Sequence, residues 1–322
     1  MLSRVADSLY WMSRYLERAE HVARQLDIHL NLVLDQASEE AGRRRNRIAA
    51  CLTHQSTLSI ESDYEFAQVL TFSPSNANSL SNCIALAREN ARQIREQINS
   101  LMFEQINQIY LKIRQTNAEA IWEGEPHEFY HSINEGIYLV QGMTDSRMSH
   151  DQGWQFIRVG QYIERVLTTA SLVACEFDEL FDPKSPNTVS DQQTYLDWVG
   201  LLRGCAAFEA YSKVHTANIQ PLRVAEFLVL NPAFPHSVRF AVHALQESLT
   251  AIAVDTETHK GSRVNRLAGR LHAMLDYGQI DEVIDGGLSS FLNDIQNRCY
   301  QLHDAVYQTY INYPIEEKLI PA

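Results

Sequence analysis

The sequence predicts an all-α protein, a single large helical bundle made of two diverged, pseudo-twofold-related helical repeats. Helix breakers are sparse, with 13 glycines and 9 prolines in 322 residues. Apolar residues recur at steps of three and four over long stretches, and the register of one such stretch returns later in the chain. No stretch alternates apolar and polar residues for long enough to predict a strand.

The first predicted helix runs from residue 2 to residue 33. Its apolar positions keep steps of three and four throughout: Leu2, Val5, Leu9, Met12, Leu16, Ala19, Ala23, Leu26, Leu30 and Val33. Such a heptad-like seam is typical of a long helix that packs lengthwise against another helix.

A second helix repeats the register of the first at a shift of 147 residues. Its apolar positions are Phe156, Val159, Ile163, Val166, Ala170, Val173 and Phe177. The same shift carries the dipeptide Glu17-Arg18 onto Glu164-Arg165. We therefore predict an internal duplication within one domain, residues 1–322, with repeats at about 1–147 and 148–322.

A second match, at a shift of 158 residues, relates the loop after residue 70 to the loop after residue 228. In each loop a proline, Pro74 or Pro232, precedes a serine by five residues, Ser79 or Ser237. This spacing predicts a serine N-cap on the helix that follows, over 82–101 and 239–254. Further helices are predicted over 191–218, 262–275 and 280–313.

Composition excludes several classes of function. The formal net charge of −13 repels phosphate backbones and anionic membranes, so we expect no nucleic-acid or membrane partner. The densest basic run, Arg43 to Arg45 with Arg47, is expected to be a solvated helix end or loop.

The cysteines and the N-terminal segment favour a cytoplasmic protein. The five cysteines are scattered singly, which predicts neither a zinc site nor a disulfide framework. Charged residues interrupt the first 20 positions, and no run reaches the ~18 apolar residues needed to cross a bilayer. We expect no export signal and no anchor.

The two Glu-Arg dipeptides lie on helix faces that are rich in aromatic residues. Neighbouring helix residues point about 100° apart, so each glutamate needs a partner elsewhere. The favoured hypothesis is a reciprocal pair across the pseudo-twofold axis, Glu17 with Arg165 and Glu164 with Arg18. The alternative is a charged central cleft that binds a substrate or partner. Its candidate residues are Arg14, Glu17, Arg18, Trp154, Glu164 and Arg165.

A second candidate face carries three arginines at helical spacing, Arg88, Arg92 and Arg95, with Asn90 beside them. Three guanidinium groups on one face suit a phosphate or a carboxylate, although a solvated or ion-paired face is the commoner outcome. Only residues 128–131 fit the Glu-x-x-His spacing of a di-iron bundle, and no nucleotide, serine-hydrolase or zincin motif occurs. We expect no metal and no cofactor.

The chain resembles the bacterial alpha-E family of all-helical domains, named for a Glu-Arg motif. The resemblance covers residues 2 to about 275. It departs at Val166 and Leu167, where the family commonly has Ala-Asp, and at His236, where Arg is common. The stretches that carry the resemblance are Leu2 to Ala6, Tyr15 to Glu20, Ala87 to Glu96, Gly153 to Gly160, Ile163 to Arg165 and Pro235 to Val238.

The resemblance implies which proteins this chain acts with, but it does not imply a reaction. Members look to be encoded with a circularly permuted ATP-grasp ligase and a transglutaminase-like protein, in a system proposed to make or modify peptides. The first hypothesis is an accessory or scaffold protein that binds the ligase or its peptide substrate. The alternatives are an enzyme that uses a central Glu/Arg-lined cleft for amide chemistry, and a structural homo-oligomer. Catalytic residues and substrate stay unassigned.

Overall fold

The computed structural model describes residues 1–35, 38–53, 60–181, 192–216, 218–256 and 261–312. These residues form helices and their connections, with no strand among them, so the predicted all-α class is confirmed. The α-helices are α1 (Ser3–Leu32), α2 (Ser38–Thr53), α3 (Asp63–Phe72), α4 (Leu80–Gln93), α5 (Ser100–Arg114), α6 (Ala118–Glu123), α7 (Pro126–Arg147), α8 (Gln152–Leu180), α9 (Gln192–Gly204), α10 (Phe208–His215), α11 (Pro221–Leu230), α12 (Val238–Thr256), α13 (Gly261–Asp276), α14 (Ile280–Asp285) and α15 (Leu288–Val306). A 3₁₀ turn, η1 (Val33–Asp35), follows α1, and a π-helical turn, η2 (Tyr307–Ile311), follows α15.

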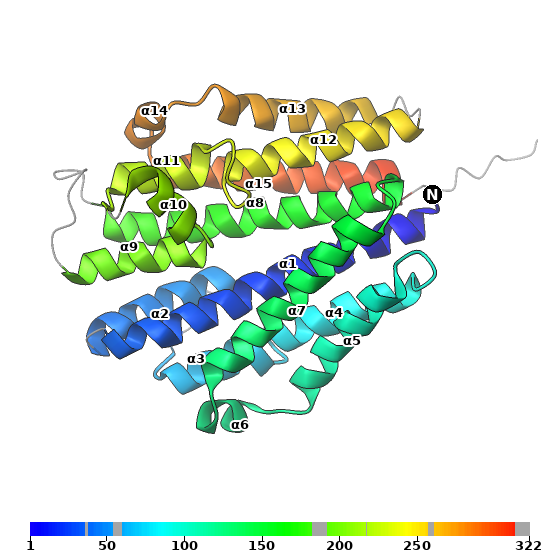
Figure 1. Cartoon of the computed structure of the whole chain (residues 1–322). Helices are drawn as coiled ribbons and strands as arrows, with labels where there is room; N and C mark the ends of the chain where they lie inside the picture. Colours follow the sequence, from blue (N-terminus) through cyan, green and yellow to red (C-terminus); the bar gives the residue numbers. More distant parts are fainter. Residues whose placement is uncertain (36–37, 54–59, 182–191, 217, 257–260, 313–322) are drawn as a thin grey trace, which may run out of the picture.

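Two long helices, α1 and α8, pack lengthwise through the middle of the molecule (Figure 1). On one side α1 also contacts α4 and α7, and on the other α8 contacts α12 and α15. These are the two helices whose heptad seams the sequence predicted, within one to four residues at each end. The internal duplication and the pseudo-twofold axis stay predictions.

The α1/α8 seam is close because a glycine faces the neighbouring backbone. A Cβ atom at Gly160 would overlap the Ser13 hydroxyl and the carbonyl oxygen of Tyr10. Contacts advance together along both helices, from Tyr10 beside Gly160 to Arg18 beside Glu164, so α1 and α8 run parallel. Parallel packing brings residues about 147 positions apart face to face, which is where the two Glu-Arg dipeptides meet.

The two helices predicted to begin with a serine N-cap only partly follow prediction. Ser237 caps α12, because its Oγ accepts a hydrogen bond from the amide of Phe240 at 3.1 Å. Ser79 occupies the equivalent position before α4 but makes no side-chain hydrogen bond to a helix amide, so the predicted cap is wrong there. The helix predicted over 82–101 ends at Gln93, and the one predicted over 191–218 is split into α9 and α10.

The basic run is not a solvated helix end or loop, so that prediction is wrong. Arg44 lies inside α2 and is 1% exposed. Arg47 donates to Glu176 of α8 at 3.0 Å, and Arg45 donates to Asp63 of α3 at 2.8 Å. The run therefore ties α2 to its neighbours. None of the described helices is long and apolar enough to cross a membrane.

Candidate functional site

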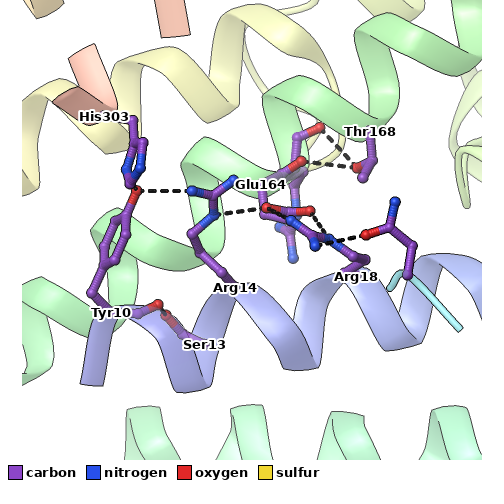
Figure 2. A network of polar contacts seen from close by, with 9 residues as sticks. Tyr10, Ser13, Arg14, Arg18, Glu164, Thr168 and His303 are labelled. Atoms are coloured by element: carbon purple, nitrogen blue, oxygen red, sulfur yellow. Dashed lines mark hydrogen bonds and ion pairs between the residues drawn. The ribbon is translucent and has the colours of Figure 1, made fainter. Parts of the chain in front are cut away.

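The second Glu-Arg dipeptide meets two arginines of the first helix (Figure 2). Arg18 donates to both carboxylate oxygens of Glu164, at 2.6 and 3.1 Å, which is a bidentate pair. Arg14 donates from Nε to Oε2 of the same carboxylate at 2.8 Å. Glu164 and Arg14 are buried, whereas the Arg18 side chain is 21% exposed. One carboxylate thus accepts hydrogen bonds from two guanidinium groups.

The first dipeptide completes the reciprocal arrangement. Arg165 donates to both carboxylate oxygens of Glu17, at 2.5 and 2.9 Å, and both side chains are buried. Gln141 of α7 adds a hydrogen bond to Glu17 at 3.3 Å. The ion pairs expected from the sequence, Glu17 with Arg165 and Glu164 with Arg18, are therefore both present.

The number of partners decides how each carboxyl group titrates. Burial by itself raises the pKa of Glu164, but the attraction of Arg14 and Arg18 outweighs it and holds the pKa at about 2. Burial also raises the pKa of Glu17, and there the single guanidinium of Arg165 does not reverse the effect. The pKa of Glu164 is too low for a general base that works near neutral pH, and both carboxylate oxygens of Glu17 accept hydrogen bonds from Arg165.

A third buried ion pair, missed in the sequence, extends the network along α1. Glu20 and Arg24 pair with each other, and Arg24 donates to the carbonyl oxygen of Gly204 at 3.0 Å. The i, i+4 spacing of a glutamate before an arginine on one helix was the available signal. Together these contacts tie α1 to the end of α9.

The network lies between two cavities. The first, of about 370 Å³, opens between α1, α7 and α8. Its walls include Met12, Glu17, Tyr138, Gln141, Trp154 and Arg158. The second, of about 90 Å³, lies on the side that faces α2 and α15. Its walls include Arg14, Arg18, His21, Cys51, Glu164 and Tyr300.

Of the six residues proposed for a central cleft, five line a cavity. Glu17 and Trp154 line the first, and Arg14, Arg18 and Glu164 line the second. Because the cavities are separate, these residues do not share one cleft. Arg165 is among the residues that line neither.

Sequence reasoning missed Arg158, the most available cation in the first cavity. Its guanidinium lies over the rings of Trp154 and Tyr162, at 4.6 and 5.0 Å from their centres. In the part of the chain that the structure describes, no carboxylate pairs with it. Its spacing from both aromatic residues, four positions along a helix, was the signal that could have revealed the stack.

The Arg88 face does not join the network. Arg88 donates to Asn107 at 2.7 Å, and Arg92 pairs with Glu89 on the surface. Arg95 stacks on a phenylalanine ring, and the Asn90 amide donates to a backbone carbonyl of its own helix. None of these four residues lines either cavity.

A family model described as a predicted alpha-helical domain with a conserved ER motif matches residues 1–311. The chain belongs to the Alpha-E family. The letters of that motif, glutamate then arginine, occur here at Glu17-Arg18 and Glu164-Arg165. In this Alpha-E chain both copies lie in the α1/α8 seam and are paired across it, with Arg18 partly exposed.

Other similar proteins carry no assigned activity. Uncharacterized proteins of Mycobacterium bovis (strain ATCC BAA-935 / AF2122/97) and Mycobacterium tuberculosis (strain CDC 1551 / Oshkosh) are each 20% identical over 323 residues. The match covers 91% of this chain and 34% of theirs, so the chain spans about a third of those relatives. No solved structure matches the chain. Among the described residues, no three His, Cys, Asp or Glu side chains are grouped to hold a metal ion.

Proposed function

We propose that this Alpha-E chain is an accessory or scaffold component of a cytoplasmic peptide-synthesis or peptide-modification system. It binds a circularly permuted ATP-grasp ligase or the peptide substrate of that ligase, and a transglutaminase-like protein acts in the same system. The chemistry is supplied by these partners. The basis for the partners is the family resemblance, and the basis for a binding role is the geometry of the Glu-Arg network.

One observation carries the binding role: the charges of the two dipeptides pair with one another in the interior. Glu164 is saturated by two guanidinium groups, and Glu17 is held by a bidentate partner. Buried ion pairs of this kind specify how helices pack. A proton-transfer role would need a group with a free lone pair and a pKa near the working pH. The network therefore favours a rigid protein that binds a partner over one that transfers protons.

The first cavity supplies a suitable surface for a peptide. Its wall combines the aromatic rings of Tyr138, Trp154 and Tyr162 with the amide of Gln141 and the stacked guanidinium of Arg158. Aromatic faces bury apolar side chains, and an arginine fixed by stacking binds a carboxylate with little loss of side-chain freedom. A cavity of about 370 Å³ admits one or two residues of a peptide rather than a folded segment.

The lengths of the mycobacterial relatives support a partner. About two thirds of each relative lies outside the part that matches this chain. A related domain is thus covalently joined to further polypeptide in those proteins. This supports the proposal that an Alpha-E domain acts beside other polypeptide.

The test is co-expression of the full chain with an ATP-grasp ligase from the same organism. We expect the two to elute together in size-exclusion chromatography, and we expect no turnover by the Alpha-E chain alone. Arg158→Gln should weaken binding of the ligase's peptide substrate, measured by calorimetry. Arg92→Gln, on the exposed face of α4, is the matched control and should bind as well as the wild type. Separate elution together with no peptide binding would contradict the proposal.

The enzyme alternative has one observation in its favour. Glu17 and Glu164 each line a cavity, so a ligand can reach both carboxylates. Amide chemistry at these groups predicts that Glu17→Gln abolishes product formation while the chain stays folded. A scaffold role predicts instead that any loss of product follows the loss of stability. Measuring both quantities on the same variant separates the two.

A further inference from the structure

The second cavity contains more positive charge than its carboxylates neutralise. Arg14 and Arg18 both pair with Glu164, and no other carboxylate of the described residues pairs with either arginine. Two guanidinium groups and one carboxylate leave one positive charge in excess. Arg14 is 5% exposed and Glu164 is 3% exposed, so water screens this charge poorly.

The neighbouring Tyr10, His21 and His303 do not supply the missing negative charge. The hydroxyl of Tyr10 accepts a hydrogen bond from Arg14, but burial raises its pKa to about 12, so it stays neutral. Burial lowers the pKa of His21 to about 3, so its ring is neutral as well. His303, which hydrogen-bonds Tyr10 at 2.7 Å, also has a pKa lowered by burial.

The other dipeptide shows that the excess is specific to this side. Glu17 pairs with Arg165 alone. The position that corresponds to Arg14 at the shift of 147 is Gln161, which is uncharged and lines the first cavity. The second positive charge is therefore a feature of the second cavity and not of the Glu-Arg motif itself.

The Arg14 guanidinium has N–H groups beyond the two that bind Glu164 and Tyr10. Its Nε binds Glu164 and its Nη1 binds Tyr10, whereas Nη2 has no partner among the described residues. Arg14 and the partly exposed Arg18 line the same cavity, together with Tyr300, whose side chain carries a hydroxyl group. Guanidinium and hydroxyl donors around one small space are the groups that bind oxyanions.

We propose that the second cavity binds a small oxyanion, a carboxylate or phosphate group, whose charge is balanced by Arg14 and Arg18. At about 90 Å³ the cavity takes the charged group itself and leaves the rest of a larger ligand outside, past Tyr300. Arg14 is the principal donor to the oxyanion, because Arg18 already donates two hydrogen bonds to Glu164 and one to Asn78. The proposed oxyanion site does not depend on the proposed role beside a peptide ligase.

The test titrates the full chain with sodium phosphate, sodium acetate, trialanine and trialanine amide, at constant ionic strength in chloride. We expect phosphate or acetate to bind in calorimetry and to raise the unfolding temperature of the wild type. A carboxylate site also takes trialanine but not its amide, whereas a phosphate site prefers inorganic phosphate. Arg14→Gln should raise Kd about tenfold or more, the effect of losing a hydrogen bond to a charged group.

Two further variants keep the test decisive. Arg92→Gln, on the exposed face of α4 and away from both cavities, should bind each anion as the wild type does. If Arg14→Gln does not fold, Arg18→Gln, at a more exposed position, should also weaken binding, by a smaller factor. Absence of binding by every probe at millimolar concentration, or unchanged affinity in the folded arginine variant, would overturn the proposal.

Discussion

Single residues decide what the Glu-Arg motif can do, and Glu17 shows this most clearly. Its carboxylate receives two hydrogen bonds from Arg165, which among the described residues has one other acceptor, the carbonyl oxygen of Pro235 at 3.4 Å. The two side chains are buried together. Removing one of them leaves the other charge without a counter-ion at a position with little exposure to water.

We expect Glu17→Gln to lower the free energy of unfolding by about 3–5 kcal/mol, the cost of leaving a buried charge unpaired. The double variant Glu17→Gln with Arg165→Met should recover part of this loss, because no unpaired charge remains. Urea unfolding at pH 7 measures both. Glu89→Gln breaks the exposed pair with Arg92 and is the control, with no measurable change expected. Equal stability of Glu17→Gln and wild type would show that the pair does not hold the seam.

His21 makes the stability depend on pH. Burial lowers its pKa from 6.5 to about 3, and the nearby charge of Arg24 acts in the same direction. The unfolded chain therefore binds a proton first as the pH falls. The contribution of neutral His21 is complete above pH 6.5 and is lost as the pH falls toward 3.

His21→Gln should flatten the fall in stability between pH 6.5 and 4.5, by up to about 1.4 kcal/mol per pH unit. Some slope should remain, because burial also lowers the pKa of His236. Urea unfolding at several pH values gives both slopes. Identical slopes for variant and wild type would mean that His21 is protonated in the folded protein.

The pairing of the two dipeptides was predictable at this scale, but the residues around them were not. A shift of 147 between parallel helices places each glutamate opposite the other copy's arginine. Nothing in that spacing says that Arg14 joins Glu164 or that Arg44 is buried against Glu176, since both contacts depend on side-chain direction. The charge pattern around Arg44 matches a solvated helix, and tertiary packing overrides it.

At the scale of elements, long periodic helices were predicted well and their interruptions were not. The apolar steps continue through Ile84, Ala87, Ala91, Ile94 and Ile98 without a glycine or proline, yet α4 ends at Gln93. The break is a turn in which the amide of Ile94 donates to the carbonyl oxygen of Ala91. Ile94 and Ile98 stay buried beyond the end of α4, so the periodicity of buried residues does not reveal the break.

The contact between α1 and α8 depends on Gly160. Gly160→Ala should lower stability by roughly 1–3 kcal/mol, because its methyl group meets the backbone of Tyr10 and the helices must separate. Gly142, exposed in α7, has open space at its Cβ position. Gly142→Ala should raise stability by about 0.5–1 kcal/mol through helix propensity. Thermal unfolding of both variants checks the opposite signs, and a neutral Gly160→Ala would contradict the close packing.

At the scale of the whole molecule, charge is divided between surface and interior. The chain carries a net charge of −13, yet its buried seam carries an excess of guanidinium groups. A second buried cluster, Arg44 and Arg47 with Glu176, joins α2 of the first predicted repeat to α8 of the second. Both clusters therefore cross between the repeats, and neither repeat is electrostatically complete alone.

This arrangement predicts that residues 1–147 and 148–322 do not fold as separate chains. Cutting after residue 147 exposes the apolar seams of α1 and α8 and leaves Glu17, Arg165, Glu164 and Arg44 without their partners. Each fragment alone should show weak helical circular dichroism and no cooperative thermal transition. Mixed in equal amounts, the fragments should recover helicity, because the unpaired charges and apolar seams complete each other. Two fragments that melt cooperatively by themselves would show that the ion clusters join finished domains, and that the repeats are independent bodies.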